Sequence, residues 1–265
     1  MDIGNNILEH VSIDEVEQVN VSFSNRIFSK GTSKGCQEKW LKDNLYIKLN
    51  SRGRREDISE VLVSHFLEYT NISNFVRYYP CIVIEDGIER GLGCYSRSFL
   101  NDDESCYSFA KILRSEGLRI EDVSYKDVIS TFDKIGYNVK EYLDDCLCLD
   151  AIICNEDRHL NNLAMIGTGD LLRPAPIFDN GLSCLCDLYE YPLEESDLQL
   201  MYRVRPKTFG GTFKDQIVNN GVKPIKINKE KFLENTVVKT EIEERALNII
   251  KYNLFRLEGV AWQEF

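Results

Sequence analysis

One stretch of this sequence limits its fold and chemistry more than any other. Residues 155–162 read Asn-Glu-Asp-Arg-His-Leu-Asn-Asn, and residues 178–181 read Phe-Asp-Asn-Gly. Asp157 thus precedes Asn162 by five positions, and a second carboxylate, Asp179, follows beyond two short predicted strands. Phosphoryl transfer uses this set, because one Asp orients the attacking hydroxyl and accepts its proton, while the Asn and the second Asp bind Mg²⁺. The pattern predicts a kinase, against the alternative of an Asx-rich surface loop.

The bulk composition is that of an ordinary globular chain and narrows the choice of partner. The 265 residues suit one large domain or two lobes, and 43% of them are hydrophobic and 28% charged. The formal net charge of −11 disfavours nucleic acid as a partner, whereas the charge of ATP can be balanced locally by Mg²⁺ and lysines. Because the sequence shows neither a leader peptide nor a membrane-length apolar run, we expect a cytoplasmic protein, unless a dedicated secretion system exports it.

The nine cysteines form no metal-binding or redox pattern. Two pairs are spaced as C-x-C, at 146/148 and 184/186, but no C-x-x-C occurs and no histidine lies at zinc-finger spacing. We therefore expect reduced thiols that serve as small core side chains.

Hydrophobic periodicity divides the chain into a strand-rich first part and a helical second part. Strands are expected at 19–28, 45–49, 81–84, 93–99, 163–166 and 176–178, and helices at 58–69, 123–135, 139–154 and 241–262. Asp57 and Glu60 are spaced as a capping box at the start of the first helix. We expect an α+β fold with two lobes, residues 1–100 and 101–265, and a nucleotide in the crevice between them.

Lys48 is the expected phosphate-binding lysine, since it lies among apolar residues of a short predicted strand. It would contact the α- and β-phosphates, although an edge-strand lysine is the alternative. Its expected partner is a glutamate on the following helix. Glu60 fits best, but it can equally cap the helix, and Glu56 is then the substitute.

The junction of the two lobes is expected at Ser98, Phe99 and Leu100, where the last strand of the first lobe ends. Backbone groups at such a junction can bond the adenine edge of a nucleotide. The alternative, a plain connector between lobes, is compatible with that role.

A glycine-containing loop precedes Lys48 and is a second candidate for phosphate binding. Gly31 and Gly35 enclose Thr32, Ser33 and Lys34, so backbone N–H groups there can approach phosphates closely. An ordinary hairpin is the alternative. Neither a G-x-x-x-x-G-K-[ST] nor a G-x-G-x-x-G pattern occurs, which argues against a Walker-type or a Rossmann site.

Several of these segments together resemble a known family. The Asp-Arg-His-x-x-Asn pattern at 157–162 resembles that of phosphatidylinositol kinases. The whole run 150–162, with Phe-Asp-Asn-Gly-Leu-Ser at 178–183, is more closely similar to the HipA-like serine/threonine kinases. Residues 35–39 are similar to that family's G-x-Q-x-K segment, and 206–209 resemble a K-P-F-like segment after its activation loop. The chain is shorter than full HipA toxins and nearer the compact, CtkA-like members.

The resemblance implies a two-lobed protein-kinase-like fold, ATP and Mg²⁺ as cofactors, and a protein Ser or Thr hydroxyl as acceptor. It also implies that His159 hydrogen-bonds around Asp179, that Arg158 braces the catalytic loop, and that Thr32 or Ser33 can be autophosphorylated. An antitoxin-like partner is left open.

Three other functions are weighed against this one. A lipid or small-molecule kinase would use the same machinery. The net charge of −11 disfavours work at an anionic membrane surface but does not argue against a soluble small acceptor. A non-catalytic nucleotide-binding module would not require all of the catalytic residue types. A metal hydrolase built on Asp157, His159 and Asp179 is hard to assemble with three histidines and no H-x-H or H-E-x-x-H.

Overall fold

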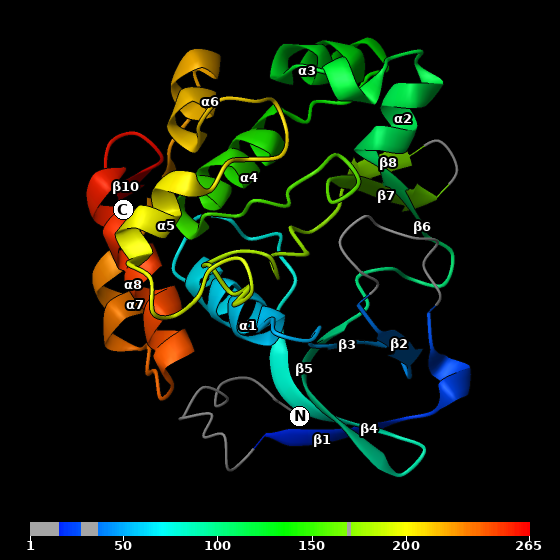
Figure 1. The fold of residues 1–265 in the computed structure, drawn as a ribbon. Coiled ribbons are helices and arrows are strands. Elements are labelled where there is room, and N and C mark those ends of the chain that lie inside the picture. The colour runs from blue at the N-terminus through cyan, green and yellow to red at the C-terminus, as the bar shows by residue number, and fades with distance from the viewer. Residues whose placement is uncertain (1–15, 28–36, 169–170) are drawn as a thin grey trace.

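The structure is a computed structural model that describes residues 16–27, 37–168 and 171–265. It is a mixed α+β fold of two lobes, one built on a curled five-stranded sheet and the other mainly helical (Figure 1). Helix α1 (Glu56–Leu67) lies between them, because it packs against strands β4 (Tyr79–Glu85) and β5 (Ile88–Arg97) and also against helix α8 (Glu241–Arg256). The two-lobed α+β fold predicted from the sequence is confirmed, whereas the division at residue 100 stays a prediction.

The sheet of the first lobe has the strand order β1-β4-β5-β3-β2, in which β1 runs parallel to β4 and the other pairs are antiparallel. Its remaining strands are β1 (Glu17–Val21), β2 (Lys39–Lys42) and β3 (Leu45–Leu49). Strands β4 and β5 are joined by a tight turn, in which Asp86 and Gly87 have φ values of 48° and 81°. Strand β5 pairs with β4 on one side and with β3 on the other, and Lys48 of β3 is buried.

The first strand is shorter than the predicted range 19–28. It ends at Val21, and the chain turns through the short 3₁₀ segment η2 (Phe23–Asn25). The backbone N–H and the hydroxyl of Ser22 both donate to Asn25 Oδ1, at 3.0 and 2.9 Å. This local bonding competes with strand pairing and ends β1.

Helix α1 begins earlier than predicted, at Glu56, with Arg55 as its N-cap residue and without a side-chain cap. The capping box predicted between Asp57 and Glu60 is therefore wrong. Asp57 instead accepts hydrogen bonds from Arg55 Nε and Nη2, both at 2.9 Å. The carboxylate of Glu60 is thereby left for contacts with the strands and loops around the helix.

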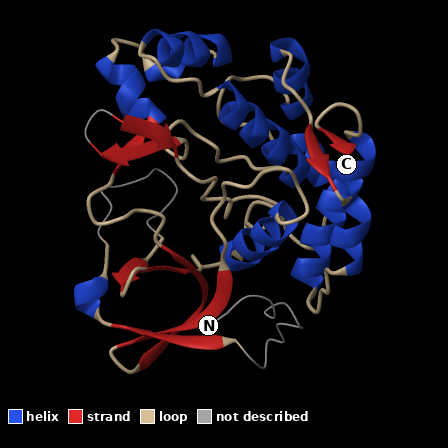
Figure 2. Cartoon of the chain, turned by 180° about the vertical axis from the view of Figure 1, so that it is seen from behind, coloured by secondary structure: helices blue, strands red, loops and turns tan. Residues whose placement is uncertain are grey.

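The second lobe holds two small sheets and most of the helices (Figure 2). Its elements besides α8 are β6 (Ser105–Ser108), α2 (Phe109–Ser115), η3 (Ile120–Asp122), α3 (Tyr125–Lys134), α4 (Lys140–Ile153), β7 (Ala164–Thr168), β8 (Leu171–Pro174), α5 (Asp197–Arg203), α6 (Phe213–Asn220), β9 (Ile225–Ile227), α7 (Lys229–Glu234) and β10 (Trp262–Glu264). Strands β6, β7 and β8 form one antiparallel sheet, and β9 pairs with β10. Helix α4 is the centre of the lobe, since all of its residues from 142 to 153 except Asp145 are buried. The eight described cysteines are free thiols, and all of them but Cys106 are buried.

The strand predicted at 176–178 is wrong. The hairpin partner of β7 is β8, which ends at Pro174, and Ile177 makes only an isolated bridge to Phe75. Pro174 and Pro176 lack the N–H that a strand ladder needs, so the chain leaves the sheet before it reaches residues 178–181.

The C-terminal helix is shorter than the predicted range 241–262. Helix α8 ends at Arg256, the chain turns at Gly259 with a φ of 71°, and Trp262 begins β10. In the described ranges, no helix combines the length and the apolar character needed to cross a membrane.

Candidate active site

Three charged side chains lie together between the lobes. They are Lys48 of β3, Glu60 of α1 and Asp179. Lys48 Nζ lies 2.6 Å from Glu60 Oε1 and 2.8 Å from Asp179 Oδ1. Lys48 is 6% exposed and Glu60 is fully buried. Glu56, the substitute candidate, lies elsewhere and accepts a hydrogen bond from the backbone N–H of Ser51 at 3.0 Å. The structure therefore brings Glu60, and not Glu56, to Lys48.

Opposite charges favour the ionised forms of Lys48 and Asp179. Burial by itself lowers the pKa of Lys48, but the carboxylates of Asp179 and Glu60 raise it well above the usual value. Burial likewise raises the pKa of Asp179, yet the positive charges of Lys48 and Lys39 hold it well below its ordinary range. One buried cation thus faces two carboxylates, so that the cluster has room for a further positive charge.

The backbone around Asp179 is held in an unusual conformation. Asp179 has a φ of 60°, a left-handed value that is uncommon for a residue other than glycine. The N–H of the next residue, Asn180, donates to Glu60 Oε2 at 2.9 Å. Gly181 then passes so close to α1 that a Cβ there would lie 3.2 Å from Glu56 Cβ. Observed strain of this kind is common at functional sites, where surrounding contacts enforce it.

Arg158 connects the 155–162 loop to this carboxylate segment. It is 4% exposed, and its guanidinium donates to the carboxylate of Asp150 on α4 at 3.1–3.2 Å. The same guanidinium donates to the carbonyl oxygen of Phe178 at 2.6 Å and to Asn180 Oδ1. The general bracing role implied for Arg158 by the sequence resemblance thus has defined partners, which the sequence did not indicate.

Asp157 lies at the surface of the loop, and its side chain is 24% exposed. Asn162 Nδ2 donates to the backbone carbonyl of Asp157 at 3.2 Å, which leaves the amide oxygen of Asn162 available. The backbone N–H of His159 donates to the same carbonyl at 2.7 Å. His159 Nδ1 is buried and has no hydrogen-bond partner among the described residues, so the bond to Asp179 implied by the resemblance is not made through this atom.

Lys207 is a site residue that sequence reasoning missed. Its Nζ lies 2.5 Å from Asp157 Oδ1, although the two residues are 50 positions apart. The only sequence signal was the K-P-F-like segment at 206–209, which indicates a family feature but no contact with the catalytic loop.

The junction between the lobes is apolar on one side. Phe99 and Phe178 have ring centroids 5.5 Å apart and pack with Ala164 and Ile166 of β7. The N–H of Leu100 donates to Ser98 Oγ at 3.2 Å. The backbone N–H of Leu100 is therefore already bonded within the junction, and the nucleotide-binding role expected for Ser98, Phe99 and Leu100 stays a prediction.

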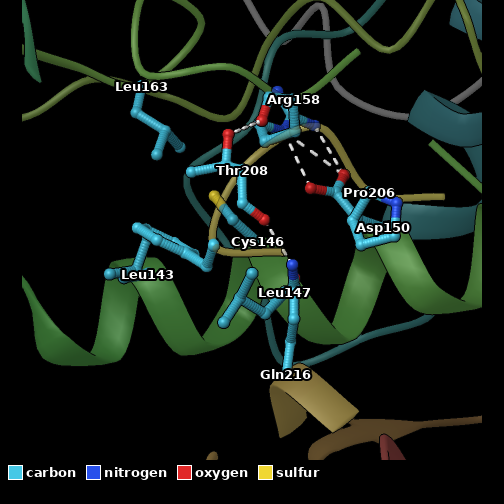
Figure 3. A pocket seen from close by; sticks show the side chains of 10 residues that line it. Leu143, Cys146, Leu147, Asp150, Arg158, Leu163, Pro206, Thr208 and Gln216 are labelled. Atoms are coloured by element: carbon cyan, nitrogen blue, oxygen red, sulfur yellow. Dashed lines mark hydrogen bonds and ion pairs between the residues drawn. The ribbon is translucent and has the colours of Figure 1, made fainter. Parts of the chain in front are cut away.

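A small pocket lies behind the catalytic loop, between α4 and the segment 206–209 (Figure 3). Apolar side chains of α4 line one side, and the Asp150–Arg158 ion pair lines the other. Thr208 donates to the carbonyl oxygen of Arg158, and Gln216 of α6 donates to the carbonyl oxygen of Thr208. The segment that carries Lys207 is thereby attached to the catalytic loop.

The oxygen donors of Asp179 and Asn162 are of the type that Mg²⁺ prefers. Mg²⁺ is commonly held by one or two protein oxygen ligands together with phosphates and water. Asp179 supplies an ionised carboxylate whose Oδ1 is bonded to Lys48, and Asn162 supplies an amide oxygen. The described residues contain no group of three or more His, Cys, Asp or Glu that could hold a metal ion without such help.

Part of the predicted site lies outside the described residues. The residues concerned are Gly31, Thr32, Ser33, Lys34 and Gly35. The phosphate-binding and autophosphorylation roles expected for this loop stay predictions.

The fold and the Lys48–Glu60–Asp179 cluster define a two-lobed, protein-kinase-like architecture. Among solved structures, the chain is similar to the proinflammatory kinase CtkA of Helicobacter pylori, with 14% sequence identity, coverage of 92% of this chain and 96% of that chain, and a TM-score of 0.63. This likeness confirms the HipA/CtkA-like fold predicted from the sequence.

A second solved structure is more distant. HipA, in the Shewanella oneidensis MR-1 complex of HipA, HipB and operator DNA, matches with 12% identity, coverage of 88% of this chain and 57% of that chain, and a TM-score of 0.48. No protein-family profile matches the sequence, and no curated protein sequence does.

Proposed function

We propose that the protein is an ATP- and Mg²⁺-dependent phosphotransferase, and specifically a serine/threonine protein kinase. The observation that carries the proposal is the contact of Lys48 with Glu60 at 2.6 Å and with Asp179 at 2.8 Å. A lysine held between a helix glutamate and a metal-binding aspartate is the arrangement that kinases need before they can position a nucleotide. The likeness in fold to a kinase supports the same class.

Each residue of the site has a role in this proposal. Lys48 steadies the α- and β-phosphates, and Asp179 and Asn162 hold Mg²⁺, which neutralises phosphate charge. The backbone at Phe99 meets the adenine edge. Asp157 orients the acceptor hydroxyl and takes its proton. The protein thus contributes mainly positioning and charge stabilisation.

A protein acceptor is proposed over a lipid because the net charge of −11 disfavours an anionic membrane surface. Autophosphorylation at Thr32 or Ser33 belongs to the same proposal. Added phosphate there would repel the phosphates of ATP, so the modification would limit its own progress.

The test is incubation with γ-labelled ATP and Mg²⁺, with the protein alone and with cell lysate. Label on the protein or on lysate proteins, released as phosphoserine or phosphothreonine, is the expected result. Label only in the lipid or small-molecule fraction would contradict the choice of acceptor, and nucleotide binding without any transfer would indicate a non-catalytic module. Mass spectrometry of the peptide between Lys30 and Lys39 locates self-modification.

Asp157→Asn is the negative variant, and Asp133→Asn, which removes an exposed carboxylate on α3, is the matched control. Transfer should be at least ~100-fold slower in Asp157→Asn and should match the parent in Asp133→Asn.

A further inference from the structure

Asp157 faces a cation that the proposed function does not use. Lys207 Nζ lies 2.5 Å from Asp157 Oδ1, and the two side chains are 40% and 24% exposed. An ion pair this open to solvent contributes only about 0–1 kcal/mol to folding. A contribution to folding stability therefore does not explain well why Lys207 contacts the carboxylate of Asp157.

The backbone that follows Lys207 is bonded to the catalytic loop and to α6. Thr208 Oγ1 donates to the carbonyl oxygen of Arg158, the residue next to Asp157. Gln216, 5% exposed on α6, donates to the carbonyl oxygen of Thr208 (Figure 3) and also to that of Gly210. The backbone after Lys207 is thus held in place, whereas the Lys207 side chain is partly exposed and its ammonium contacts only Asp157 among the described residues. It can move from Asp157 to a nearby anion without disturbing the core.

The other cations that act on the described site serve other groups. Lys48 is buried and bonds Glu60 and Asp179, and Lys39 acts on Asp179. Arg158 is buried and bonds Asp150. None of these three is bonded to the side chain of Asp157, where the proton of the acceptor is proposed to go.

We propose that Lys207 is a further catalytic residue, which binds the γ-phosphoryl group beside Asp157 during transfer. The inference rests on the proposed kinase function. In the reaction the acceptor oxygen forms a bond to the γ-phosphorus while the bond from that phosphorus to the bridging oxygen breaks. The electron pair of the broken bond leaves with ADP, and the acceptor proton passes to the carboxylate of Asp157.

Negative charge is concentrated between Asp157 and the transferring group in this step, and a mobile ammonium there stabilises it. Asp157 Oδ1 accepts the hydrogen bond from Lys207, so Oδ2, which has no partner among the described residues, is left to meet the hydroxyl. Lys207 therefore acts beside the catalytic carboxylate without blocking it.

The test compares Lys207→Met with Lys207→Arg and with the control Lys214→Met. Lys214 is an exposed cation of the same stretch, and its charge acts on Asp215. The dissociation constants of ATP and ADP are measured by calorimetry with Mg²⁺, and phosphate transfer is measured in single turnovers. ATP and ADP differ only in the γ-phosphate. The ratio of their dissociation constants therefore reports directly on the contact between Lys207 and that phosphate.

We expect Lys207→Met to weaken ATP about tenfold, the scale of one charge-assisted hydrogen bond, and to leave ADP unchanged. Transfer should fall about 100-fold, as for the loss of one charge-stabilising donor. Lys207→Arg should regain most of the ATP affinity, and Lys214→Met should match the parent in both measurements.

The inference would be overturned if Lys207→Met left the ratio of the ATP and ADP dissociation constants unchanged, for example by weakening both nucleotides equally. Phosphate transfer within threefold of the parent would also overturn it. Binding of ADP shows that the variant is folded. If the parent itself transfers no phosphate, the proposed function fails, but the ATP-to-ADP ratio still decides whether Lys207 binds the γ-phosphate.

Discussion

Arg158 and Asp150 form a buried ion pair behind the catalytic loop. Arg158 Nε lies 3.2 Å from both carboxylate oxygens of Asp150, and Nη2 lies 3.1 Å from Oδ1. The two residues are 4% and 2% exposed. Because the guanidinium also bonds Phe178 and Asn180, the pair connects the 155–162 loop to the 178–181 segment.

The pair is expected to matter for both stability and activity. Asp150→Asn leaves a buried guanidinium without its counterion and should cost about 3–5 kcal/mol of unfolding free energy. The double variant Asp150→Leu/Arg158→Met removes both charges and should regain most of that loss, but it should remain inactive, because the bonds to Phe178 and Asn180 are gone. Urea unfolding and the γ-labelled ATP assay measure the two properties. An active double variant would show that Arg158 is not needed to position the loop.

Glu60 and Glu56 give a matched pair of variants on one helix. Glu60→Gln keeps an oxygen for the N–H of Asn180 but removes the charge that holds Lys48, so kcat/KM for ATP should fall about 10- to 100-fold. Glu56→Gln should stay within about threefold of the parent, since its carboxylate bonds Ser51 and not Lys48. Steady-state kinetics with ATP as the varied substrate tests both, and the reverse ranking would assign the role to Glu56.

Asp179→Ala should abolish the part of nucleotide binding that depends on Mg²⁺, because it deletes the charged metal ligand. It also removes one of the two carboxylates that Lys48 bonds. The measurement is the thermal shift produced by ATP, with Mg²⁺ and with EDTA in its place. A variant that is stabilised by ATP with Mg²⁺ as strongly as the parent would remove Asp179 from the metal site.

Asp157→Asn should still bind ATP and Mg²⁺ but transfer phosphate at least ~100-fold more slowly, the usual scale for a lost general base. The amide keeps the shape of the side chain, so binding is an internal control for folding. Rapid-quench kinetics measures the chemical step. Turnover close to that of the parent would mean that another group accepts the proton.

Replacing Asp145 on α4 by Asn is expected to stabilise the protein by an amount that depends on pH. Burial, together with the nearby carboxylates of Glu141 and Asp144, raises the pKa of Asp145 to about 6 from its ordinary value of 3.8. A carboxyl whose pKa is raised in the folded state destabilises that state when ionised, and the cost is complete above the folded pKa and declines as the pH falls toward the unfolded pKa.

Asp145→Asn should therefore stabilise the protein by about 1–2 kcal/mol near pH 7.5, with allowance for solvent screening, and by much less near pH 4.5. Thermal melts at the two pH values give the comparison, and the exposed-residue variant Asp133→Asn is the control. An equal gain at both pH values would rule out titration of Asp145 as the cause.

The sequence by itself determined the features that depend on neighbours along the chain. Strand β3 and helix α4 follow from apolar periodicity, and the tight turn at Asp86 and Gly87 follows from residues that tolerate positive φ. The spacing of Asp157 and Asn162 could be recognised because residues 155–162 form one contiguous run. Lys48 could be chosen because burying a lone lysine in an apolar strand is costly unless its charge is matched by a partner.

The tertiary structure alone decided which distant side chains meet. Lys48 lies 131 positions from Asp179 in sequence, and Lys207 lies 50 from Asp157. Two glutamates one helical turn apart on α1 are nearly equivalent in sequence, and only the packing of α1 against the sheet directs Glu60 to Lys48. Periodicity reports which face of an element is buried, but the partner on the other side of the interface depends on how the elements pack, and that choice is made across the whole core.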